Sequence, residues 1–178
     1  VRSAVEALVR SGGLRHELAW AWAQRSRDRE EAEEVRRRAE QGDAEAMWRM
    51  GTWRDAGEKS LGLNRRDAYR WFRRSAEAGD VRGMACLGAA LANGRGVAKC
   101  HSEAVFWLSA AAHGGSDRAA FGVGKMFKLG VLGMQADSAK AKLWLQRVVH
   151  GEMEHQHCTS SLLEEAAEML RELEERDL

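Results

Sequence analysis

The 178-residue chain contains no proline and only one tyrosine, but it contains 18 glycines. Proline ends helices, because its ring clashes with the preceding turn and it has no backbone N–H to donate. Helices in a chain without proline must end at other residues, and glycine is the residue that most often closes a helix C-terminus. The positions of the glycines therefore indicate where the helices end.

The chain also has a net charge close to zero and no long apolar segment. Lys and Arg together number 28 and Asp and Glu 27, which leaves a formal net charge of +1. Binding to a polyanion needs a concentrated positive field, so nucleic acid is not expected as the main partner. No run of 18 or more apolar residues is present, and insertion into a membrane is not expected.

The three cysteines, Cys86, Cys100 and Cys158, are odd in number and do not recur at a fixed interval. This usage favours reduced thiols, and it predicts a cytoplasmic or other reducing compartment. The N-terminal segment has too short an apolar run for a secretory signal. The chain begins with Val rather than Met, so we expect a fragment or a trimmed chain from which any targeting signal would be missing.

Many of the glycines recur at a fixed interval, which indicates an internal repeat. Residues 39–57, AEQGDAEAMWRMGTWRDAG, align without a gap with residues 76–94, AEAGDVRGMACLGAALANG. A third copy, AHGGSDRAAFGVGKMFKLG, occupies residues 112–130, so the copies begin 37 and 36 residues apart. A period of this length is typical of a solenoid of stacked units. An aromatic segment follows each copy and carries Trp71, Trp107 and Trp144.

Each copy predicts a pair of helices. In the first helix the apolar residues fall at helical spacing, and a glycine stands inside the helix at Gly51, Gly88 and Gly124. A glycine inside a helix costs about 1 kcal/mol relative to alanine, so we expect these three to allow close approach of the neighbouring helix. The second helix carries large residues such as Trp71 and Phe72 on one face, which favours packing against its partner. The first helices are expected to end at Gly57, Gly94 and Gly130.

The expected fold is all-α, without strands: a right-handed α-solenoid of stacked antiparallel helix pairs, or α-α superhelix, with about ten helices. We expect one continuous domain, with a degenerate N-terminal repeat or cap at residues 1–38 and a C-terminal capping helix at residues 152–178. Between them, residues 39–151 would hold three repeats, at 39–75, 76–111 and 112–148.

The two ends of the chain depart from the repeat. In the N-terminal section we expect two helices, at about 14–26 and 28–40, the second with Ala32, Val35 and Ala39 turned inward. The C-terminal helix has an apolar stripe opposite many charges, as a cap of a solenoid requires. Its alternative interpretation is a coiled-coil or partner helix.

These residues resemble the Sel-one-like repeat (SLR) family, relatives of the tetratricopeptide repeats with longer internal loops. The family pattern is roughly G-D-x-x-A-x-x-x-L-G-x-x-Y-x-x-G-x-G-V, followed by A-x-x-W and an aromatic residue. In the first copy it is carried by Gly42, Asp43, Ala46, Met50, Gly51, Gly57, Ala68, Trp71, Phe72 and Ala76. In the second copy it is carried by Gly79, Asp80, Leu87, Gly88, Gly94, Gly96, Val97, Ala104, Trp107, Ala111 and Ala112. The resemblance covers about residues 39–151 and implies protein–protein scaffolding rather than any one reaction.

The chain departs from the family pattern at several positions. Gly83 replaces the usual alanine, and Arg54 and Leu91 stand where the family prefers tyrosine. Some family members are secreted and carry cysteine pairs eight positions apart. The matching positions here are Ala76 and Met84, so the chain does not resemble that branch.

The expected binding surface is the concave face, which the resemblance assigns to the first helices of the pairs. The predicted partner-binding residues are Trp48, Arg49, Thr52, Asp55, Ala85, Ala89, Phe121 and Lys125. Large side chains at Trp48 and Phe121 on either side of Ala85 and Ala89 would form a groove with two aromatic walls, suited to a helix or an extended peptide. The alternative is that Trp48 and Phe121 pack between units.

A histidine-rich turn suggests a different functional class. His150, His155, His157 and Cys158 are possible zinc ligands, and they support the alternative of a small metal-dependent hydrolase. Their spacing is poor, because in a helix His157 points away from His155 and Cys158, and no second ligand cluster is evident. The preferred interpretation has no metal, cofactor or catalytic residue. It is a non-catalytic scaffold, adaptor or assembly subunit that binds another protein or a peptide, alone or within a larger complex.

A basic stripe also calls for interpretation. Arg66, Arg70, Arg73 and Arg74 share the outer face of one second helix, but the later copies do not continue the stripe. Binding of nucleic acid would need further basic units in register or interleaved aromatic residues. A solvated helix face is the better interpretation.

Overall fold

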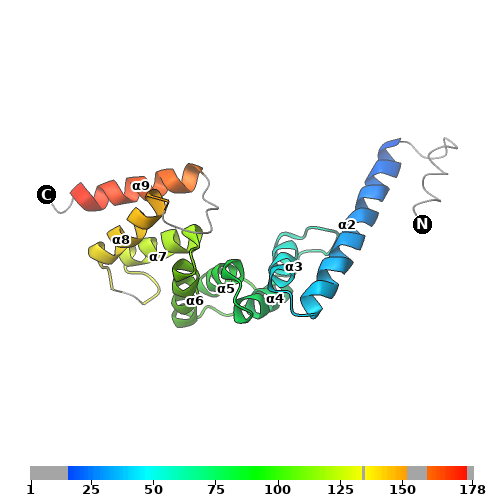
Figure 1. Ribbon diagram of the computed structural model, residues 1–178, viewed down its shortest axis with the longest axis horizontal. Helices are drawn as coiled ribbons and strands as arrows, with labels where there is room; N and C mark the ends of the chain where they lie inside the picture. The colour runs from blue at the N-terminus through cyan, green and yellow to red at the C-terminus, as the bar shows by residue number, and fades with distance from the viewer. Residues whose placement is uncertain (1–15, 134, 152–159, 176–178) are drawn as a thin grey trace.

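The computed structural model describes residues 16–133, 135–151 and 160–175. Within these residues every element is an α-helix, and no strand is present (Figure 1). They are α2 (His16–Glu40), α3 (Ala44–Ala56), α4 (Arg65–Glu77), α5 (Val81–Asn93), α6 (His101–His113), α7 (Asp117–Leu129), α8 (Ser138–Val149) and α9 (Ser160–Glu175). The described residues thus hold eight helices, where we expected about ten for the whole chain.

The helices form a curved row in which each packs mainly against the next one along the chain (Figure 1). The closest-packed partners are α3 with α4, α5 with α6 and α7 with α8, and these pairs are the units of the repeat. At the ends of the row, α2 packs on α3 and α9 packs on α8. The fold is therefore an α-solenoid of sequential helix pairs, as the sequence predicts.

The N-terminal section differs from the prediction of two helices at about 14–26 and 28–40. One continuous helix of 25 residues, α2, runs through the expected break. No glycine or proline interrupts it, and side-chain hydrogen bonds span the break: Gln24 donates to Asp28 at 3.2 Å, and Arg27 donates to Gln24 at 3.0 Å. As predicted, the second half of α2 turns small apolar residues toward the row, and these are Ala32, Val35 and Ala39.

The loop between α3 and α4 fastens α2 to the first unit. The Lys59 ammonium group lies 2.8 Å from a carboxylate oxygen of Glu31 and 3.1 Å from one of Asp28, and these two bonds raise the pKa of Lys59. Arg49 of α3 lies 3.2 Å from the same Glu31. This loop is longer and more polar in the first copy than in the second, and its lysine adds ion pairs to the apolar packing of α2 on α3.

The glycines inside the first helices lie at helix contacts, which confirms the expected close approach. A Cβ added at Gly51 would lie 2.5 Å from the Phe72 ring, and one added at Gly88 would lie 2.7 Å from Leu108 Cγ. At Gly124 the distance to Leu145 Cγ would be 3.0 Å. Each glycine faces the residue that follows the tryptophan of its own partner helix. The repeat therefore encodes one interhelical contact three times.

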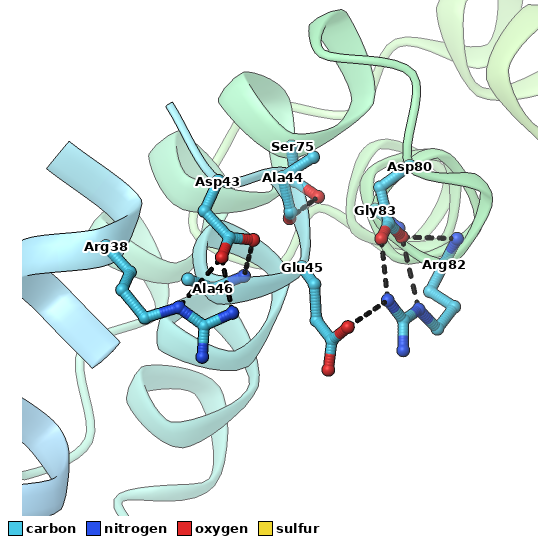
Figure 2. Close-up of polar contacts among 9 residues, drawn as sticks. All are labelled: Arg38, Asp43, Ala44, Glu45, Ala46, Ser75, Asp80, Arg82 and Gly83. Atoms are coloured by element: carbon cyan, nitrogen blue, oxygen red, sulfur yellow. Dashed lines mark hydrogen bonds and ion pairs between the residues drawn. The ribbon is translucent and has the colours of Figure 1, made fainter. Parts of the chain in front are cut away.

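Each first helix also begins and ends in the same way. Asp43 and Asp80 accept hydrogen bonds, each of 3.0 Å, from the backbone N–H groups of Ala46 and Gly83 (Figure 2). The bond from Ala46 is the main cause of the lowered pKa of the Asp43 carboxyl. Ser116 caps α7 at the equivalent position. The C-terminal ends are glycines in the left-handed conformation, Gly57, Gly94 and Gly130.

The departure of Gly83 from the family pattern has a structural cause. Ser75 of α4 is fully buried, and its hydroxyl donates a 2.8 Å hydrogen bond to the carbonyl of Ala44 (Figure 2). A Cβ on Gly83 would lie 2.7 Å from Ser75 Cβ and closer still to Ser75 Oγ. In the following unit the equivalent positions are both alanine, Ala111 and Ala119. The serine–glycine pair thus replaces an alanine–alanine pair.

We expect Gly83→Ala to destabilise the protein by roughly 1–3 kcal/mol, because the new methyl group overpacks against Ser75. Ser75→Ala alone removes one hydrogen bond and should cost about 1 kcal/mol. The double variant should lose less than the sum of the two single variants, since residues in contact are coupled. Denaturant unfolding of the four proteins measures this coupling, and strictly additive losses would contradict it.

Candidate functional site

A groove of about 580 Å³ lies across the first helices of the three units. The small residues Ala85, Ala89 and Ala92 of α5 line its middle, and Phe72 of α4 and Leu108 of α6 contribute apolar surface. The volume falls within the range of known ligand pockets, which is roughly 300–1,000 Å³. The groove is thus a depression made by three consecutive units rather than by one.

Five of the eight residues predicted to bind a partner line this groove. Thr52 and Asp55 come from α3, Ala85 and Ala89 from α5, and Lys125 from α7. Thr52, Ala89 and Lys125 hold equivalent positions of the repeat, so stacking brings these three together.

The other three predicted residues do not line the groove. Trp48 is half-buried, and the Arg82 guanidinium of the next unit lies 4.3 Å from its ring centroid. Arg49 instead pairs with Glu31 of α2. Phe121 is only 9% exposed and belongs to the hydrophobic core. Trp48 and Phe121 therefore lie outside the lining of this groove, and both rings belong to the packing of the hydrophobic clusters.

The groove also uses two residues that the sequence interpretation missed, one on α5 and one on α7. Cys86 and Gly122 directly follow Ala85 and Phe121, and both line the groove. On α5 the lining thus extends beyond the predicted Ala85 to Cys86, and on α7 it includes Gly122 where Phe121 was predicted. One signal was present in the sequence, because Gly122 lies inside a helix outside the repeating glycine positions.

Gly122 is required neither by packing nor by the backbone conformation. A Cβ at this position would meet no atom within 4 Å, and Gly122 does not have a positive φ. A glycine inside a helix still costs about 1 kcal/mol relative to alanine. The absence of a side chain leaves the groove open at this point of α7.

The rim of the groove is basic. Asp55 forms ion pairs with Arg95 and, at 4.0 Å, with Arg65. Lys125 lies 2.8 Å from a carboxylate oxygen of Glu165 on α9. Arg118 also lines the groove. The lining residues therefore carry four basic side chains against a single carboxylate, that of Asp55.

The Cys86 thiol does not have the properties of a nucleophile. Burial raises its pKa, and a hydrogen bond with Trp48 and the charge of Arg118 offset this only in part. A raised pKa lowers the fraction of the reactive thiolate at neutral pH. Cys86 and Cys100 are both free thiols. The groove is thus suited to binding rather than to covalent chemistry at Cys86.

The candidate metal ligands cannot be placed together. His150 is exposed at the end of α8, while His155, His157 and Cys158 lie outside the described residues. Within the described ranges no three His, Cys, Asp or Glu side chains are grouped as metal ligands would be. The basic stripe Arg66, Arg70, Arg73 and Arg74 is exposed on α4 and lies away from the groove.

No helix among the described residues combines the length and the apolar character needed to cross a bilayer. This statement covers residues 16–133, 135–151 and 160–175 only.

No family model matches the chain, and no curated protein does. Solved structures that are similar to it include the following two. The first is a Sel1 repeat protein from Oxalobacter formigenes, with 27% identity and a TM-score of 0.63, covering 78% of this chain and 96% of that one. The second is c5321, a protective antigen present in uropathogenic Escherichia coli strains that displays an SLR fold. It has 27% identity and a TM-score of 0.62, and the match covers 81% of this chain but only 32% of that one.

Proposed function

Because the chain is a Sel1-like repeat protein, we propose that it is a non-catalytic scaffold or adaptor that binds a peptide or a protein surface in the groove. The observation that carries this proposal is the groove itself, a depression of about 580 Å³ shared by three consecutive units. Stacked helical repeats bind partners along extended concave surfaces of this kind. The proposed binding surface consists of Thr52, Asp55, Ala85, Cys86, Ala89, Gly122 and Lys125.

The same proposal assigns a supporting role to the predicted residues outside the groove. Trp48 and Phe121 pack between units, and Arg49 joins α3 to α2, so they would fix the shape of the groove without touching the partner. The free thiols of Cys86 and Cys100 support a reducing compartment, such as the cytoplasm. As an adaptor, the chain would act as one subunit of a larger assembly.

The test fills the groove without disturbing the fold. We expect Gly122→Leu to be at least as stable as the wild type, because leucine is a better helix former and its Cβ meets open space. Random peptides displayed on phage and selected on the wild-type protein should bind this variant at least about tenfold more weakly, a loss of about 1.4 kcal/mol. Fluorescence anisotropy of the selected peptides and a thermal melt provide the two measurements.

The matched control is Ala139→Leu, which adds the same side chain at an exposed position of α8 away from the groove. It should bind the selected peptides as the wild type does. Equal binding to all three proteins, or no peptide enriched above an unrelated helical protein, would contradict the proposed function.

A further inference from the structure

Arg118 is the basic residue of the groove that has no carboxylate partner in the part of the chain that the structure describes. Arg65 and Arg95 share Asp55, and Lys125 is paired with Glu165. The Arg118 side chain is exposed at the start of α7, where it lines the groove. Its charge is therefore available to a bound molecule.

The repeat explains why this arginine is unpaired. Arg82 holds the equivalent position in the preceding unit, where it lies 2.8 Å from Asp80 and 3.7 Å from Glu45 (Figure 2). The helix cap before Arg118 is Ser116 instead of an aspartate. The residue equivalent to Glu45 is, for Arg118, the basic Arg82 itself. Both carboxylates that neutralise Arg82 are thus missing around Arg118.

Gly122 places open space next to this charge. It lies four residues after Arg118, so the two positions share one face of α7. A side chain at Gly122 would meet nothing within 4 Å. Ala85 and Ala89 of α5 also line the groove. An unpaired guanidinium therefore borders a small apolar surface.

Resting on the proposed function, we propose that the groove binds an acidic segment of a partner protein. An Asp or Glu carboxylate of the segment pairs with Arg118, and an apolar side chain next to it lies over Gly122 and Ala89. The guanidinium group matches a carboxylate through two parallel hydrogen bonds, which makes such pairs strong and specific in geometry. The excess of basic over acidic groups lining the groove also steers an acidic partner toward it.

The test uses peptides selected from a random phage library on the wild-type protein. We expect the selected peptides to carry at least one Asp or Glu beside an apolar residue. Arg118→Gln should weaken their binding about tenfold or more, and Arg118→Lys should weaken it less. Replacing the critical peptide Glu by Gln should cause a similar loss with the wild type, and no further loss with Arg118→Gln. Raising the salt concentration should weaken the wild-type complex more than the Arg118→Gln complex.

Arg70→Gln is the matched control, because it removes the same charge from an exposed position on α4 away from the groove. It should bind the peptides as the wild type does. Peptides that lose binding on Gly122→Leu but lack acidic residues, or that tolerate Arg118→Gln, would overturn this inference and leave the scaffold proposal intact. Peptides indifferent to Gly122→Leu, or no enriched peptides, would overturn both.

Discussion

Gly88→Val should lower the free energy of unfolding by about 3 kcal/mol, and the melting temperature by roughly 6–12 °C. A Cβ at this position lies 2.7 Å from Leu108 Cγ and 3.0 Å from the Leu108 backbone nitrogen. The Leu108 side chain can change rotamer, but the backbone of α6 moves only if the two helices separate. Valine adds two further methyl groups to this contact, and both helices belong to the middle unit of the solenoid. A thermal melt followed by circular dichroism measures the effect.

Arg73→Ala is the control for this prediction. Arg73 is exposed on α4 and pairs with Glu77 within the same helix, and an exposed pair of this kind contributes little. The variant should therefore stay within about 0.5 kcal/mol of the wild type. Equal melting temperatures for Gly88→Val and Arg73→Ala would show that Gly88 does not lie at a tight helix contact.

Gly96→Ala is expected to cause a loss of similar size, about 3 kcal/mol, although it adds a single methyl group. Gly96 has a positive φ of 75°, and its Cβ would lie 2.8 Å from the Arg66 backbone nitrogen and closer still to the Arg65 carbonyl. No side chain can move aside, because the obstructing atoms are the backbone at the start of α4. The loop after α5 would have to detach from the preceding unit.

The positive φ alone does not explain why residue 96 is a glycine. Lys59 and Leu132 hold the equivalent positions of the other two units, with φ of 52° and 58°. The matched control is Gly62→Ala, since Gly62 has a φ of 70° and its Cβ would meet nothing within 4 Å. This control should lose only about 1 kcal/mol from backbone strain. Denaturant unfolding compares the two variants, and losses of the same size would exclude the backbone clash.

The sequence predicts those parts of the fold that depend on contacts within one unit. Gly88 is an example, because its phase in the repeat matches that of Gly51 and Gly124, and a recurring helix-interior glycine indicates a close neighbour. The helix caps Asp43 and Asp80 can also be predicted from the sequence, because a cap accepts hydrogen bonds from backbone groups only two or three residues away. Both kinds of contact depend on short stretches of chain.

The parts that were predicted wrongly or not at all depend on how neighbouring helices are placed. Phe121 and Gly122 are adjacent on one helix, and which of them faces the groove is decided by the rotation of α7 against α5 and α6. The residue pattern of α7 alone does not specify this rotation. The expected break in α2 fails for a different reason, because no glycine or proline stops the helix at residues 26–28 and the Gln24–Asp28 bond spans them. Arg118 was missed although its signal was present, as Ser116 replaces an aspartate cap.

Each helix packs mainly against the next one along the chain, so the curvature of the solenoid can change through small rotations at successive helix interfaces. The groove spans three units joined in series, so its width depends on the angles of successive interfaces and not on a rigid frame. Small rotations at each interface add up along a stacked repeat, and a few degrees at α4–α5 and α6–α7 would bring α3 and α7 nearer or further apart. A bound segment that touches both helices would therefore oppose this elastic motion, and the stiffness of the whole row would rise with occupancy of the groove.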